Sequence, residues 1–150
     1  MSIFSSLNTT SSALTAQRLR MDVISSNMAN AETTRANFVD GKWQPYRRKM
    51  VEIEPNTTST FTSVFNQVRG NNNTSGGVKV TNIVEDKTEF KLVYNPEHPD
   101  ADDLGYIAMP NVDPLKETVD MMSATRNYEA NITVFNANKS MLMKSLEIGK

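Results

Sequence analysis

Seven-residue spacing of apolar side chains is clearest in the stretch LNTTSSALTAQRLRMDVISSNM, residues Leu7–Met28. Steps of three and four residues alternate along it, which is typical of a helix that packs lengthwise on another helix. No Pro or Gly interrupts the stretch, so we expect one long helix. One line of the repeat is apolar and the interleaved line is partly polar: Leu7, Leu14, Met21 and Met28 form the first, and Ile3, Thr10, Gln17, Ile24 and Ala31 the second.

The last forty residues show the same spacing. Asp113-Pro114 is typical of a helix start, because Asp accepts hydrogen bonds from free amides and Pro is tolerated at the first helical position. No Gly or Pro follows until Gly149, which predicts a second long helix. Its two lines are Met121, Tyr128, Phe135 and Leu142, and Thr118, Thr125, Ile132, Lys139 and Leu146.

The material between the two helices favours short strands and loops. Apolar or alternating runs at Tyr46–Ile53, Val78–Thr81, Phe90–Tyr94 and Tyr106–Met109 predict strands. The Asn- and Gly-rich stretch near 70–77 predicts a flexible loop. The fold class is therefore α+β, with two long terminal helices paired as an antiparallel, coiled-coil-like hairpin around a small β-rich insert. Residues 1–32 and 112–150 would form a helical domain, and residues 33–111 a β-rich central domain.

Composition excludes several classes of protein. A net charge of −1 argues against a dedicated nucleic-acid binder, and a chain without Cys and with one His cannot build a Cys-based or multi-His metal site. The N-terminus lacks the pattern of a cleaved signal peptide, and no stretch is apolar enough to span a membrane. The apolar fraction is 38%, below the usual value of about 45–50%, so a single copy has a thin core and we expect partners to cover more of it.

No active site is visible. Started at Asp100, the polar loop Asn95–Tyr106 has acids at the first and third positions of a calcium loop. It lacks a side-chain oxygen at the fifth position, Leu104, and the bidentate carboxylate at the twelfth, Asn111. We expect a solvated turn there, with His98 exposed, although a metal-dependent hydrolase based on 97–103 stays an alternative. Arg47-Arg48-Lys49 is interpreted as a solvated strand edge rather than a phosphate site. We therefore predict a protein that is not an enzyme, with no catalytic, cofactor or metal residues.

The two ends of the chain resemble a known family. Residues 12–34 are similar to the N-terminal signature of the flagellar rod, hook and hook-associated proteins. The segments 105–113, 121–131, 135–141 and 146–149 resemble the proximal-rod members of that family, and residues 45–49 and 94–102 support the same likeness. The resemblance covers nearly the whole chain, and it identifies Asn27, Asn30 and Thr33 as the family's helix-end motif.

This resemblance implies a structural subunit of the bacterial flagellar basal body, outside the inner membrane, exported through the flagellar export apparatus without a cleaved signal. Its implied partners are the rod proteins FlgB, FlgF and FlgG, the protein FliE, and further copies of the chain, with no nucleic acid and no membrane insertion. A stand-alone coiled-coil adaptor is the alternative function. The residues expected to matter for assembly at the helix seams are Leu7, Leu14, Gln17, Met21, Ile24, Met28, Met121, Tyr128, Ile132, Phe135, Leu142 and Leu146.

Overall fold

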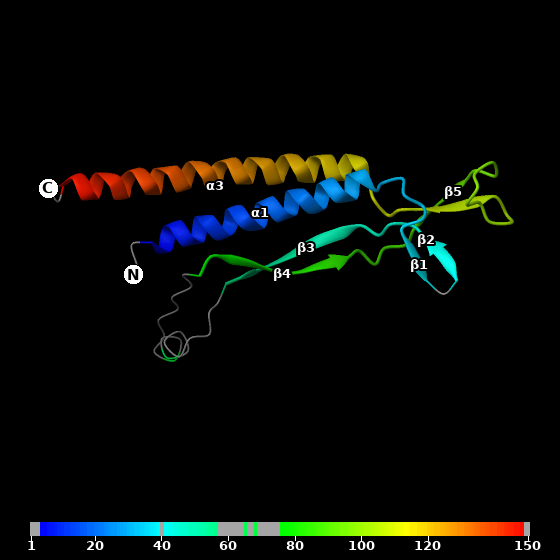
Figure 1. The fold of residues 1–150 in the computed structure, drawn as a ribbon, viewed down its shortest axis with the longest axis horizontal. Coiled ribbons are helices and arrows are strands. Elements are labelled where there is room, and N and C mark those ends of the chain that lie inside the picture. The colour runs from blue at the N-terminus through cyan, green and yellow to red at the C-terminus, as the bar shows by residue number, and fades with distance from the viewer. Residues whose placement is uncertain (1–3, 40, 57–64, 66–67, 69–75, 149–150) are drawn as a thin grey trace. The chain divides into compact units, whose positions relative to one another are not determined.

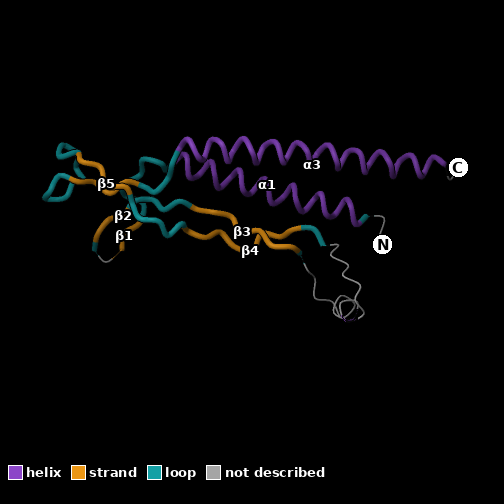
Figure 2. Tube along the Cα trace, turned by 180° about the vertical axis from the view of Figure 1, so that it is seen from behind, coloured by secondary structure: helices purple, strands orange, loops and turns teal. Residues whose placement is uncertain are grey.

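A computed structural model of the chain describes residues 4–39, 41–56, 65, 68 and 76–148. Helices stand at both ends of the chain, and the strands lie between them in sequence (Figure 1, Figure 2). The predicted α+β class is confirmed. The elements are α1 (Ser5–Ala29), β1 (Asn37–Val39), β2 (Lys42–Gln44), β3 (Lys49–Pro55), β4 (Val78–Glu85), β5 (Lys91–Tyr94), β6 (Tyr106–Met109) and α3 (Pro114–Ile148).

The described strands pair two by two. β1 pairs with β2 and β5 with β6, both antiparallel, while β3 pairs with β4. The β1–β2 hairpin is absent from our sequence prediction, although Asp40-Gly41 in the sequence is a strong hairpin signal. Gly41 has a φ of 79°. β6 and the start of α3 match the prediction, and Asp113 Oδ1 caps α3 by accepting a hydrogen bond from Leu115 N at 3.1 Å. The segment near 70–77, predicted to be a flexible loop, lies largely outside the described residues.

The chain forms two compact units, and each contains parts of both helices. The first consists of residues 1–19, 52–82 and 124–150, and the second of residues 20–51 and 83–123. The end of α1 and the start of α3 belong to the second unit, where Asn27 bonds to Glu117. The start of α1 and the rest of α3 belong to the first unit. The sequence analysis instead predicted a helical domain of residues 1–32 and 112–150 and a β-rich domain of residues 33–111. These boundaries differ from those of the two compact units, and that division stays a prediction.

The apolar core of the described residues is small. In the first unit Ala16 and Ala124 are buried. In the second unit the buried apolar side chains are Val23, Ile24, Pro45, Tyr46, Ile107, Pro110 and Val112. The two fully buried apolar side chains of the first unit are both alanines, which remove little apolar area from water.

Gly77 lies against α1 in the first unit, with φ at 71°. A Cβ at this position would clash with Ser12 Oγ and lie 3.2 Å from Thr9 Cα. Ser12 Oγ also accepts a hydrogen bond from Val78 N at 3.1 Å, so it cannot move away without loss. We expect Gly77→Ala to lower the free energy of unfolding by about 2 kcal/mol. Urea unfolding of the purified chain measures this change.

Gly41→Ala is the matched control for that measurement. Gly41 has a similar φ of 79°, but no heavy atom lies within 4 Å of a Cβ built there. Only the backbone strain should appear, at about 1 kcal/mol. Equal losses in the two variants would contradict close packing of Gly77 on α1.

Candidate functional site: a buried polar junction

Asn27, near the end of α1, is 1% exposed and uses its whole hydrogen-bonding capacity. Its Nδ2 donates to Lys49 O at 2.9 Å and to Glu117 Oε2 at 3.1 Å. Its Oδ1 accepts from Tyr46 OH at 3.1 Å and from Lys49 N at 2.9 Å. One side chain therefore connects α1 to β3 and to α3.

Glu117, in the first turn of α3, is fully buried and is paired with Arg48. Glu117 Oε1 accepts a hydrogen bond from Arg48 Nε at 2.5 Å. The guanidinium also reaches Asp120 Oδ2 at 3.2 Å and Asp86 Oδ2 at 3.7 Å. A buried carboxylate requires such partners, because an unpaired charge away from water is very costly.

Asn111 completes the arrangement from the segment before α3. Its Oδ1 accepts from Arg48 N at 2.8 Å, and its Nδ2 donates to Thr88 Oγ1 at 2.8 Å and to Asp86 O at 3.2 Å. All these contacts lie within the second unit, and together they fix the directions of α1, β3 and α3 there. We call this set the polar junction: Asn27, Tyr46, Arg48, Asp86, Asn111 and Glu117.

The helix-end motif divides into two roles. Asn30 caps α1, since its Nδ2 donates to Ser26 O at 2.9 Å, and Thr33 Oγ1 donates to Asn30 Oδ1 at 3.2 Å. Asn27 does not cap the helix and belongs to the polar junction. The sequence signal for this difference is weak, because Asn is common both at helix ends and in buried networks.

Most of the predicted seam residues lie on covered helix faces. Ile24 is buried, and Leu7, Leu14, Gln17, Met21, Met121, Tyr128, Phe135 and Leu142 are half-buried. Met28, Ile132 and Leu146 are exposed, at 40%, 37% and 71%. The second covered line of α3 runs one residue earlier than predicted, through Glu117, Ala124, Asn131 and Asn138. The role of the seam residues in assembly stays a prediction.

The prediction of a solvated strand edge at Arg47–Lys49 is wrong for Arg48. Its side chain is 12% exposed and belongs to the polar junction. The guanidinium of Arg47 lies over the Phe90 ring, 4.4 Å from its centroid. Successive residues of a strand face opposite sides, and only this alternation indicated that Arg48 differs from Arg47 and Lys49. Its partner Glu117 could not be recognised from the sequence, because it lies 69 residues further along the chain.

The loop before β6 is held by local hydrogen bonds. His98 Nδ1 accepts from Asp100 N at 3.1 Å, and Asp100 accepts from Thr34 Oγ1 at 2.8 Å and pairs with Arg35. His98 is half-buried rather than exposed as predicted. Across the described residues, no group of three acidic or His side chains is placed to hold a metal ion.

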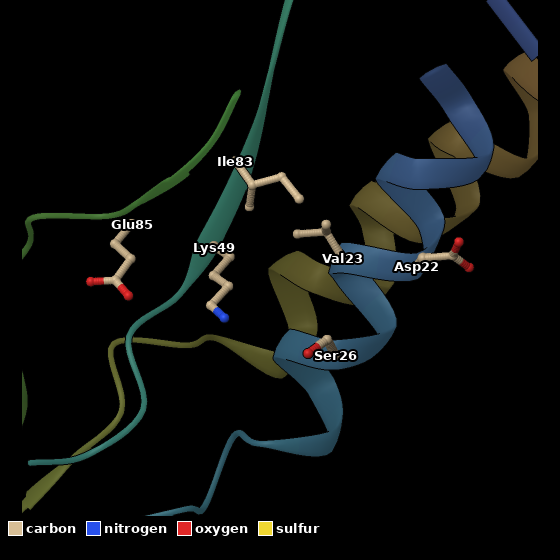
Figure 3. Close-up of a pocket in the computed structure, with 6 residues that line it drawn as sticks. All are labelled: Asp22, Val23, Ser26, Lys49, Ile83 and Glu85. Carbon is tan, nitrogen blue, oxygen red and sulfur yellow. The ribbon is translucent and has the colours of Figure 1, made fainter. Parts of the chain in front are cut away.

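A cavity of about 460 Å³ lies beside the polar junction, between α1 and the strands β3 and β4. Figure 3 shows Val23 and Ile83 pointing toward each other, while Asp22 and Glu85 point away from them. Ser26 Oγ lies 3.4 Å from the hydroxyl of Tyr46, so the cavity borders the polar junction at this point. The lining gives no nucleophile with an adjacent base, which acyl or phosphoryl transfer would require.

Asp86 makes the junction sensitive to acid. The hydrogen bond from Thr88 N, at 3.0 Å, lowers the pKa of Asp86 below its ordinary value of 3.8, and the Thr88 hydroxyl and Arg48 lower it further against the opposing effect of burial. A carboxylate with a lowered pKa stabilises the fold above about pH 4, and this stability is lost as the pH falls through the folded-state pKa.

We expect the free energy of unfolding to decrease between about pH 5 and pH 3, with a smaller decrease in Asp86→Asn. Asn keeps an oxygen that can accept the Thr88 N–H bond but carries no titrating charge. Denaturant titrations at a series of pH values measure the slope. An identical slope in the variant would contradict a contribution from Asp86.

Comparisons with known proteins place the chain in a family. Residues 7–36 match the model of the flagella basal body rod proteins, and residues 104–148 match that of the flagellar basal body rod FlgEFG protein C-terminal region. The chain is 59% identical to the flagellar basal-body rod protein FlgC of Bacillus subtilis, and the alignment covers 100% of both chains. It is 45% identical to FlgC of Borreliella burgdorferi (99% and 98% covered) and 44% to that of Salmonella typhimurium (93% and 92%).

The chain belongs to the FlgC family of flagellar basal-body rod proteins. As a member of the FlgC family it is a structural rod subunit and not an enzyme. The two matched regions contain most of α1 and all of α3, and they include Asn27 and Glu117. No helix of the described residues could cross a membrane, being too short or too polar.

Proposed function

We propose that this rod subunit assembles helically in the proximal rod through its terminal helices and transmits torque. The observation that carries the proposal is the exposed apolar surface of α3. Several of its apolar side chains are more than a third exposed in the first unit: Ile132, Val134, Met141, Met143 and Leu146. A large exposed apolar surface is typical of a protein contact.

The polar junction supports the mechanical part of this proposal. It joins α1, β3 and α3 through buried, hydrogen-bonded charges, and such networks hold one geometry rather than many. Load applied to either helix would therefore reach the strands without sliding of the helix ends. The partners we propose are further copies of the chain, the rod proteins FlgB, FlgF and FlgG, and FliE. The proposed location is outside the inner membrane, after export without cleavage of a signal.

A basal-body preparation tests the proposal. Cells that lack the native protein and express this chain with an epitope tag should be motile, and the tag should co-purify with the rod at its base. A tagged chain that restores motility but stays in the soluble fraction would overturn the proposal. The alternative, a free-standing coiled-coil adaptor, predicts a fully helical dimer in dilute solution, whereas a rod subunit should be monomeric there.

A further inference from the structure

Four exposed aromatic rings form one surface on the strands of the second unit. Phe38 and Trp43 face each other across the β1–β2 hairpin with ring centroids 5.2 Å apart, and Tyr94 and Tyr106 do so across β5–β6 at 5.3 Å. Trp43 and Tyr106 line the same groove, of about 330 Å³, which joins the two pairs. We call these four rings and the groove the aromatic surface.

The area of the aromatic surface indicates whether it could hold two free chains together as a stable dimer or only serve as one contact within a larger assembly. The four side chains are 62%, 55%, 65% and 44% exposed, in the order Phe38, Trp43, Tyr94, Tyr106. Because a buried aromatic side chain covers about 150–250 Å², they offer on the order of 450 Å² together. A stable pair of proteins buries about 800 Å² on each partner. The surface is therefore too small to dimerise the free chain, but suits one of several contacts in a polymer.

The chain also carries an exposed apolar stripe on α3. Leu115, Val119 and Met122 are 77%, 54% and 51% exposed. Their spacing of four and three residues places them on one side of α3, opposite the covered line through Glu117 and Ala124. Insertion of such a stripe into an aromatic groove is a common way to recognise a helix.

Charges at the two surfaces can also match. The groove is lined by Lys42, Asp102 and Asp100, the last of which is paired with Arg35. Asp113 and Lys116 flank the stripe, so each surface presents charges of both signs. Groove and stripe are different parts of one chain, and a contact between different patches propagates from copy to copy instead of closing into a pair.

We propose that the aromatic groove of one copy receives the Leu115–Val119–Met122 stripe of a neighbouring copy. This inference rests on the proposed assembly of copies in the rod. It adds a specific contact on the β-hairpins to the contacts of the terminal helices.

Cysteine cross-linking tests this contact, since the chain has no Cys of its own. Cells express two forms together, one with Lys42→Cys and one with Lys116→Cys, and isolated basal bodies are treated with a short bismaleimide. We expect a product of twice the 16.8 kDa chain mass. Neither form alone should give that product, and neither should the pair Lys42→Cys and Glu129→Cys, whose second site lies about 20 Å further along α3.

Each outcome decides the proposal. A product from Lys42→Cys alone would show a symmetric contact and overturn the inference, as would no product from intact basal bodies that contain both forms. These results would leave the proposed rod function standing, whereas absence of the chain from basal bodies would overturn both. Adding Trp43→Ala to the Lys42→Cys form should reduce the product about tenfold or more, because truncating a central aromatic anchor weakens an interface by that order.

Tryptophan emission gives a second readout, since Trp43 is the single Trp of the chain. At 55% exposure in the free chain, its emission should be accessible to acrylamide. When the concentrated chain polymerises, we expect a shift to shorter wavelength and protection from acrylamide. Polymers in which Trp43 is quenched as strongly as in the monomer would overturn the inference.

Discussion

Asn27→Ala is expected to lower the free energy of unfolding by about 3 kcal/mol or more. The change removes four hydrogen bonds and leaves Glu117 Oε2 and both backbone groups of Lys49 without the partner they have in the folded chain. Each buried polar group left unpaired costs about 1–3 kcal/mol. Urea unfolding followed by circular dichroism measures the loss of stability. Even if the variant is only partly helical, a lower urea midpoint would still show this loss.

Asn30→Ala is a matched control, since it changes the same residue type three positions along α1. Among the described contacts, the side chain of Asn30 hydrogen-bonds only to Ser26 and Thr33, which are close in sequence. Removing it should therefore lower the free energy of unfolding by about 1 kcal/mol. Similar losses in the two variants would contradict the central place of Asn27 in the polar junction.

Phe135→Asp is expected to abolish incorporation into the rod and motility. Phe135 is half-buried on the covered line of α3, and a carboxylate there would lose part of its hydration, which is costly without a charged partner. The β-rich part should stay folded, because the polar junction lies in the second unit. Motility on soft agar and the amount of chain in basal bodies measure the effect.

Ile132→Asp separates assembly from folding of the free chain. Ile132 is 37% exposed, so a carboxylate there can stay in water and the helix content should change little. If the outer side of α3 contacts neighbours, as we propose, motility should still fall. A motile Phe135→Asp strain would contradict a buried contact at Phe135, and a motile Ile132→Asp strain would contradict an assembly role for that side of α3.

The ends of the chain could be predicted well from the sequence because their signals are local. Asp113-Pro114 specifies where α3 begins, and heptad spacing specifies its length. The exact covered line of α3 could not be predicted by hydrophobicity, since the structure covers Asn131 and exposes Ile132. The covered line includes small and polar side chains such as Ala124 and Asn131, which a search for large hydrophobic residues does not select.

The polar junction could not be predicted from local signals, because its members are far apart in the sequence. Arg48 lies within a basic run, and Glu117 is an ordinary acid in a first helical turn, where it also suits the helix dipole. Only tertiary structure shows that these two charges meet.

The sequence separation within the junction sets the order in which the chain can fold. Asn27 and Glu117 are 90 residues apart, so their hydrogen bond closes a very long loop and must follow the local helices and hairpins. A chain still emerging from the ribosome, or passing N-terminus first through a narrow channel, already contains α1. It does not yet contain Glu117, so the polar junction at the end of α1 cannot form. The polar junction can therefore form only once the last quarter of the chain, which contains Glu117, is present.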